Sequence, residues 1–100
     1  MTSDESVAAI RRKAIRGLKR AQHELGRRYV QGIGVPENRR NGFKWWLRAA
    51  SRGYVPSMAV VGVAYLSGCG VRRDEALARR WLTRAARKRS WFAREMLKSL

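Results

Sequence analysis

Apolar residues recur along the chain at the spacing of one helical face. Ala21, Leu25 and Tyr29 follow one another four positions apart, which places them on the same side of a helix. The pattern stops at Gly32 and Gly34, and glycine readily adopts the positive φ angles found at helix ends. The pattern therefore predicts helices that are separated by glycine turns.

This pattern repeats after 36 residues. At that shift the sequence aligns with itself without gaps, and a unit of this length is typical of stacked helical or mixed repeats. Ala14 and Gly17 also match Ala50 and Gly53, so part of an earlier unit precedes the full ones. The identical pairs of the two full units are Gly26 and Gly62, Tyr29 and Tyr65, Gly32 and Gly68, Gly34 and Gly70, Val35 and Val71, Trp45 and Trp81, Arg48 and Arg84, Ala49 and Ala85, and Ala50 and Ala86.

Each unit is predicted to contain two antiparallel helices, which makes the protein all-α. Asp74 and Asn38 stand where the N-caps of the second helices are expected, and Gly53 and Pro56 mark the end of one helix and the start of the next. The expected helices span residues 4–16, 19–31, 38–52, 56–67, 74–88 and 90–99. The expected units are a partial unit 4–17, full units 18–53 and 54–89, and a partial unit 90–100.

Two glycines, Gly26 and Gly62, lie inside predicted helices. Glycine there costs up to about 1 kcal/mol relative to alanine, so we expect a neighbouring helix to approach closely at both positions. The alanine pairs at 49–50 and 85–86 should allow the same close approach from the other side. Trp45 and Trp81 are then expected to fill the wider gaps.

The unit as a whole resembles the Sel-one-like repeat family, a relative of tetratricopeptide repeats. The resemblance covers about residues 12–97 and rests on the motif L-G-x-x-Y-x-x-G-x-G-V, a capping acid, and then Trp and an Ala pair. It implies a short α-solenoid of antiparallel helix pairs that acts as a protein-interaction scaffold rather than as an enzyme. The chain departs from the family pattern at Asn38, Asn41 and Gly42, and at Arg89, which replaces a turn glycine and allows the final connection a different geometry.

The charge of the chain adds a candidate binding surface. Lys and Arg number 23 against seven acidic residues, a formal net charge of +16, and this excess attracts acidic partners. Because cations recur every four residues and again at equivalent positions of each unit, they should form a grid on the outer side of the second helices. This basic face consists of Arg12, Arg16, Lys44, Arg48, Arg52, Arg80, Arg84 and Lys88. Trp45 and Trp46 are expected to point the other way, into the core.

Three interpretations of the basic face are open. The first is a solvated surface without a partner, and the second is a binding surface for an acidic protein or peptide. The third is a surface that binds nucleic-acid phosphates without sequence preference. Phe43 is the best candidate for stacking on a base, because its equivalent Arg79 is polar and position 43 should face outward beside Leu47. Trp91 is a second candidate, although burial at the end of the core is favoured for it. Exposed aromatic residues would favour nucleic acid, and an open apolar groove would favour protein.

An apolar groove is predicted from the helix at 56–67 and the C-terminal segment. Packing against adjacent units is the favoured explanation for the apolar residues of helix 56–67. Those that remain open would accept an amphipathic helix or a second copy of the chain, and exposed terminal helices offer a further route to a homo-oligomer. The candidate groove residues are Met58, Val60, Val63, Met96 and Leu100.

Other functions find little support in the sequence. The uncharged run at 53–71 is explained by the repeat as a central helix and its turn, so no membrane span is expected. His23 and Cys69 are each the only residue of their type, which leaves no usual metal site, no disulfide and no Cys–His pair. His23 is expected on the surface, and Cys69 is expected to fill the turn position of Ile33. We expect no cofactor and no enzyme activity, and the absence of a secretory signal makes a cytoplasmic location the expectation.

Overall fold

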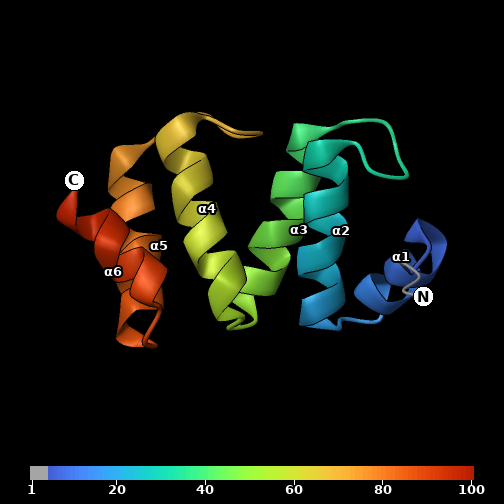
Figure 1. Cartoon of the computed structure of the whole chain (residues 1–100), viewed down its shortest axis with the longest axis horizontal. Helices are drawn as coiled ribbons and strands as arrows, with labels where there is room; N and C mark the ends of the chain where they lie inside the picture. The colour runs from blue at the N-terminus through green and yellow to red at the C-terminus, as the bar shows by residue number, and fades with distance from the viewer. Residues whose placement is uncertain (1–4) are drawn as a thin grey trace.

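The computed structural model describes residues 5–100, and over these residues it contains six α-helices joined by short turns (Figure 1). The all-α prediction is confirmed, and the helix ends agree with the expected ones to within a few residues. The expected inclusion of residue 4 in the first helix lies outside the described residues. The helices are α1 (Val7–Ile15), α2 (Lys19–Gln31), α3 (Arg39–Ser51), α4 (Val55–Ser67), α5 (Glu75–Arg87) and α6 (Trp91–Lys98).

The helices stack in chain order along the long axis of the molecule. α2 packs on α3 and α4 packs on α5 as two helix pairs, and the contacts of α1 with α2, α3 with α4 and α5 with α6 join these pairs into one row. The row measures 38 × 26 × 25 Å, with α1 and α6 at its two ends (Figure 1). The structure is therefore a short α-solenoid.

Two kinds of turn lie at opposite edges of this solenoid. The short turns from α1 to α2, α3 to α4 and α5 to α6 form what we call the lower edge, and the longer turns from α2 to α3 and α4 to α5 form the upper edge (Figure 1). At the upper edge, Gly32 and Gly68 end α2 and α4 in the left-handed conformation, with φ of 69° and 76°. The prediction that these glycines stop the helices is confirmed.

Side-chain caps fix the starts of four helices. The Oδ1 atoms of Asn38 and Asp74 accept hydrogen bonds of 3.0 Å from the backbone N–H groups of Asn41 and Leu77, as the sequence predicted. Ser6 and Ser90 cap α1 and α6 in the same way, at 3.1 Å each. The asparagine that departs from the family pattern therefore performs the same capping role as the aspartate.

The last lower-edge turn keeps the geometry of the other two. Arg89 has a φ of 71°, whereas its equivalents Gly17 and Gly53 have φ of 95° and 91°. The backbone N–H of Ser90 bonds the Ala85 carbonyl at 3.0 Å, and the two earlier turns contain equivalent bonds of 3.1 Å. The expectation of a different geometry was wrong, because the arginine accepts a left-handed backbone that is strained for any residue with a Cβ.

The glycines inside α2 and α4 do mark close helix approach. A Cβ added to Gly26 would lie 2.5 Å from Cδ1 of Trp46, and one added to Gly62 would lie 2.6 Å from Cγ of Leu82. Trp46 and Leu82 are equivalent positions in the two units. The space left by the missing Cβ of the glycine, which we call the glycine socket, therefore occurs twice. The residues that fill the sockets are these two, whereas Trp45 and Trp81 had been expected to fill the gaps.

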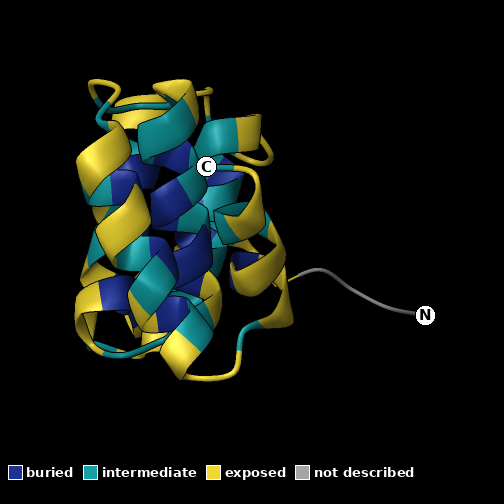
Figure 2. Ribbon diagram, turned by 90° about the vertical axis from the view of Figure 1, so that its left-hand side faces the viewer, coloured by how far each residue is buried: buried dark blue, intermediate teal, exposed yellow. Residues whose placement is uncertain are grey.

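Buried residues run through the middle of the solenoid (Figure 2). A large cluster spans α3 to α6, and a smaller cluster of Ile10, Ala14 and Leu25 joins α1 to α2. Figure 2 shows exposed residues around this core on the outward sides of the helices.

Two aromatic residues occupy the opposite environment to the one predicted. Phe43 is only 6% exposed and packs edge-on against Tyr65, with ring centroids 5.3 Å apart. Its equivalent in α5 is the polar Arg79, which is exposed. Trp91 is 70% exposed, because Ala93 is the residue of α6 that enters the core. Repeat equivalence gave the wrong environment for Phe43, and the general tendency of large aromatic residues to be buried gave the wrong one for Trp91.

Candidate functional site

All eight residues of the basic face are exposed. None of them forms an ion pair with a carboxylate of residues 5–100, since the ion pairs there use other cations. Those other cations are Lys13, Arg27, Arg28, Arg39, Arg79 and Lys98. The positive charge of the basic face is therefore left without local compensation in the described part of the chain.

Half of the basic face surrounds one depression of about 680 Å³ between α1, α2 and α3, which we call the basic depression. Its apolar lining comes from Ala14, Ile15 and Leu47. Its cations are Arg16, Lys44, Arg48 and Arg52. Arg80 and Arg84 line a separate depression on α5. The structure thus divides the predicted grid into at least two parts.

A buried amide forms the inner side of the basic depression. Gln22 is 4% exposed and donates from Nε2 to the Ala14 carbonyl at 3.1 Å. Its Oε1 is buried without a hydrogen-bond partner among the described residues. Buried polar atoms are normally satisfied, so this acceptor is an exception among the described residues.

Indole and guanidinium groups stack on the basic face at two equivalent places. The guanidinium carbon of Arg48 lies 4.6 Å from the ring centroid of Trp45, and Arg84 lies at the same distance from Trp81. Both indoles are half-buried and pack against the core clusters, whereas Trp46 is itself one of the buried core residues. The prediction that Trp45 faces away from the arginines was wrong, because residues three apart share one side of a helix. The Trp-x-x-Arg spacing was the sequence signal for these stacks.

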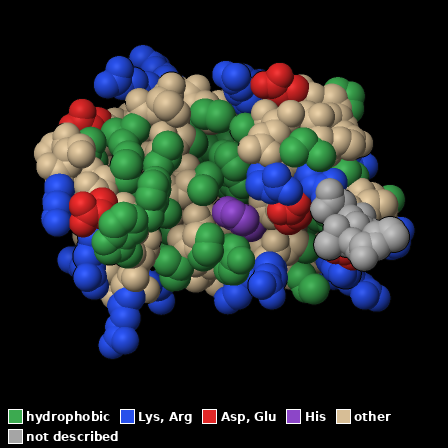
Figure 3. All heavy atoms as spheres, viewed as in Figure 1, with side chains coloured by type: hydrophobic (Ala, Val, Ile, Leu, Met, Phe, Trp, Pro, Cys, Tyr) green, Lys and Arg blue, Asp and Glu red, His purple; other side chains and the backbone are tan. Residues whose placement is uncertain are grey.

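Predicted groove residues lie in different environments. Met58 is 1% exposed and belongs to the core, so it cannot line an open groove, and packing against adjacent helices explains its burial. Val60, Val63, Met96 and Leu100 are half-buried. On the face formed by α2, α4 and α6, Figure 3 shows hydrophobic side chains gathered over α4 and α6.

The single histidine lies near the middle of that apolar face (Figure 3). It lies at the surface, as expected, and is half-buried beside α4. Its Nδ1 lies 2.7 Å from Oγ of Ser57, and its ring packs edge-on against Tyr54 at 5.4 Å. Burial lowers the pKa of His23 below its ordinary value of 6.5.

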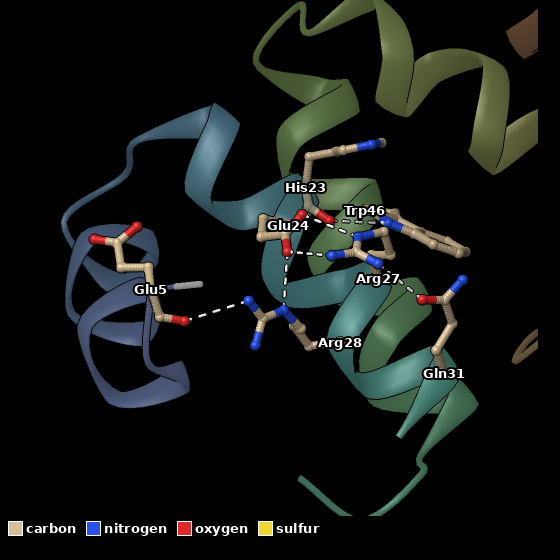
Figure 4. Close-up of polar contacts among 7 residues, drawn as sticks. All are labelled: Glu5, His23, Glu24, Arg27, Arg28, Gln31 and Trp46. Carbon is tan, nitrogen blue, oxygen red and sulfur yellow. Dashed lines mark hydrogen bonds and ion pairs between the residues drawn. The ribbon is translucent and has the colours of Figure 1, made fainter. Parts of the chain in front are cut away.

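A polar network extends from His23 toward α1 (Figure 4). The His23 carbonyl accepts a hydrogen bond of 3.1 Å from Nε1 of Trp46. The neighbouring Glu24 accepts from Arg27 at 2.6 Å and from the buried Arg28 at 2.9 Å, and these bonds, that from Arg27 first, lower its pKa. Arg28 also reaches the Glu5 carbonyl at 3.3 Å. The network joins α2 to its two neighbours and therefore has a structural role.

These groups do not assemble into a recognisable reaction centre. Ser57 beside His23 is 0% exposed, so its hydroxyl cannot reach a substrate. Within residues 5–100 no group of three or more His, Cys, Asp and Glu residues is arranged to hold a metal ion. Cys69 is half-buried against the core. None of the helices in the described part of the chain is long and apolar enough to cross a membrane.

Sequence comparison identifies the repeat. Residues 19–54 and 55–90 each match the Sel1 repeat model. The chain belongs to the Sel1 repeat family. Proteins with Sel1 repeats generally mediate protein–protein interactions, and the fold is typically a non-enzymatic scaffold. No curated protein matches this Sel1 repeat chain.

Solved structures agree with this family. The Sel1 repeat protein from Oxalobacter formigenes is 40% identical, with a TM-score of 0.80 over 82% of this chain and 63% of its own. The protective antigen c5321 of uropathogenic Escherichia coli is 38% identical, with a TM-score of 0.82 over 85% of this chain and 18% of its own. Cysteine rich protein B of Helicobacter pylori is 19% identical and shares the fold, with a TM-score of 0.86 over 90% of this chain and 68% of its own. The Sel1 repeat chain thus spans less than two thirds of the first two proteins.

Proposed function

We propose that this Sel1 repeat chain is a non-enzymatic adaptor whose basic face binds an acidic segment of a partner protein. The observation that carries the proposal is the basic depression, where four cations without carboxylate partners surround a partly apolar floor. Carboxylates that enter it would neutralise charges that repel one another in the free protein. Such a segment would also bury part of Ile15, which is 68% exposed.

The Trp–Arg stacks favour this use of the surface. A guanidinium held over an indole keeps its N–H groups free for a carboxylate, and arginine can engage a carboxylate through two parallel bonds. Because Arg48 is already placed by Trp45, less side-chain entropy is lost when it binds.

Nucleic acid is the competing partner class. Phe43 was the best candidate for stacking on a base, and its burial removes that contribution from the basic face. Nucleic acid keeps the support of the positive charge, which serves an acidic peptide equally well, and of the exposed Trp91, which lies at the α5–α6 turn and does not line the basic depression. The half-buried apolar residues over α4 and α6 offer a second, separate surface for an amphipathic helix or a second copy of the chain.

Binding of a labelled peptide of alternating glutamate and leucine tests the proposal by fluorescence anisotropy. The double variant Arg48→Gln, Arg52→Gln should weaken binding by roughly tenfold, since it removes two exposed charge pairs. The matched control Arg72→Gln, Arg73→Gln removes the same charge at the upper edge and should have a much smaller effect.

Equal losses in the two double variants would show that the peptide senses net charge only, and the basic depression would not be the site. A generic DNA duplex serves as competitor at near-physiological salt. If the duplex binds through Arg48 and Arg52 while the peptide does not bind at all, the basic face is a nucleic-acid site instead.

A further inference from the structure

The lower edge of the solenoid has a charge composition unlike that of the upper edge. Its three turns occupy equivalent segments of the repeat, residues 15–20, 51–56 and 87–92, and contain no acidic residue. They contain seven cations: Arg16, Lys19, Arg20, Arg52, Arg87, Lys88 and Arg89. The upper-edge turns, residues 31–39 and 67–75, contain three cations and three acidic residues. Positive charge is therefore concentrated on one edge.

Exposed hydrophobic residues are concentrated on the same edge. Among residues 5–100, five large hydrophobic side chains are strongly exposed, and only Ile33 of these, at 39%, belongs to the upper edge. The other four are Ile15 at 68%, Leu18 at 49%, Trp91 at 70% and Phe92 at 46%. Apolar and cationic groups thus occur together in the first and last turns of the lower edge, and the three turns follow one another along the long axis of the molecule (Figure 1).

The α5–α6 turn shows this combination most clearly. Trp91 and Phe92 begin α6 one residue after the run Arg87, Lys88 and Arg89, and all five side chains are exposed. Arg89 keeps its cation in a left-handed backbone conformation that the equivalent turns give to glycine. Backbone strain of this kind is characteristic of functional positions, and here the residue that carries it adds charge to the lower edge.

We propose that the lower edge docks on the surface of an anionic lipid bilayer. Tryptophan and phenylalanine favour the interface between headgroups and acyl chains, and Lys and Arg are attracted to anionic headgroups. The three turns project in the same direction (Figure 1), so one flat surface can contact all of them. A nucleic acid would engage the cations but would offer no apolar phase for Ile15 or Phe92. The contact is peripheral and shares Ile15, Arg16 and Arg52 with the basic depression, so a membrane and an acidic segment would compete there. The apolar face over α4 and α6 stays available for another partner.

Vesicle binding by the full chain tests the docking site, with the α5–α6 turn as target because its residues do not line the basic depression. The probes are vesicles of phosphatidylcholine alone and of phosphatidylcholine and phosphatidylserine in equal parts. Flotation should recover the protein with the anionic vesicles only. Since Trp91 is far more exposed than the other tryptophans, its emission should shift to the blue on binding.

The triple variant Arg87→Gln, Lys88→Gln, Arg89→Gln should lower the partition coefficient by roughly a hundredfold, given the attraction of each cation to an anionic surface. The matched variant Arg39→Gln, Arg72→Gln, Arg73→Gln removes the same charge from the upper edge and should lower it much less. Trp91→Ser with Phe92→Ser should lower it more than tenfold, and Ile33→Ser should leave it unchanged.

Three results would overturn the proposal. The first is that the protein does not float with anionic vesicles at near-physiological salt. The second is that both triple variants lose binding equally. The third is that the protein binds without any change in Trp91 emission. In the second case the vesicle is held by net charge, and in the third by a different face. Measuring acidic-peptide binding by the same variants distinguishes a failure of membrane docking from a failure of the adaptor function.

Discussion

At the scale of single residues, two glycines decide how closely the helices of each unit pack. Gly26 receives Trp46 and Gly62 receives Leu82, so an indole and an isobutyl group occupy equivalent sockets. The shared requirement is the absence of a Cβ on the first helix, whereas the residue that enters is free to differ. The glycine is therefore the constant part of the contact, and its partner is adapted to the local volume.

Gly62→Ala should destabilise the protein by about 1–3 kcal/mol, because the new methyl group would overlap the buried Leu82 side chain. Leu82→Ala alone should cost about 2–5 kcal/mol, because it leaves a cavity in the core. Combined with Leu82→Ala, the glycine substitution should cost much less, since the cavity accommodates the methyl group. Urea unfolding of the four proteins measures this coupling, and additive effects would argue against the socket.

The environment of His23 makes stability depend on pH. Because its pKa is lowered by burial, the folded protein binds the proton more weakly than the unfolded chain does. Stability should be fully present above about pH 6.5 and should fall as the pH decreases from there through the lower folded pKa. His23→Gln should flatten the unfolding free energy over this interval. The loss of stability below about pH 4.5 would remain in this variant, because Glu24, whose pKa is lowered in the folded protein, is protonated in that range.

At the scale of helices and turns, the chain uses the same connection three times, and the backbone strain differs among the three. Gly17 and Gly53 adopt their left-handed conformations without strain, and Arg89 adopts its own at a cost. The hydrogen bonds that follow the three turns are equivalent. The repeat geometry therefore prevails over the local preference of the arginine.

Arg89→Gly should stabilise the protein by about 1 kcal/mol, because glycine removes the steric penalty of the left-handed backbone. The same substitution should weaken binding to anionic vesicles by about fivefold, because it removes one cation from the lower edge. Thermal unfolding and flotation measure the two effects on one variant. Arg87→Gln is the control, since it removes a lower-edge cation without changing a backbone of this kind.

Helices and turns could be predicted from this sequence because their causes are local. Gly32, Gly68, Asn38 and Asp74 specify helix ends whatever lies around them. The prediction failed where the outcome depended on a neighbouring helix. Phe43 is buried because Tyr65 packs against it, and the repeat alignment with Arg79 contains no information about that neighbour. For the candidate site, periodicity placed all eight basic-face residues on the surface, but it could not group four of them around one depression.

At the scale of the whole molecule, a large net charge is distributed over a small solenoid. The formal charge of +16 repels itself in the compact state more than in an extended chain. The ion pairs of the described residues are largely exposed and contribute little in return. Folding therefore takes place against an electrostatic penalty that the glycine sockets and the buried core overcome.

Sodium chloride should consequently raise the melting temperature. At about 0.1 M salt the screening length is about 10 Å, short enough to reduce repulsion across the basic face. The triple variant Arg87→Gln, Lys88→Gln, Arg89→Gln should melt higher than the parent at low salt and respond less to added salt. Scanning calorimetry over a salt series checks this. A melting temperature that falls with salt would show that attractive ion pairs dominate.

The unequal edges also contribute a component of the electric dipole moment that has its positive end at the lower edge. Beside a negatively charged object the molecule experiences a torque before any side chain touches it, so its approach is oriented rather than random. Encounter would then begin with Trp91, Phe92 and their neighbouring cations already facing the surface. The repeat thus presents the same edge first, whichever acidic surface the molecule meets.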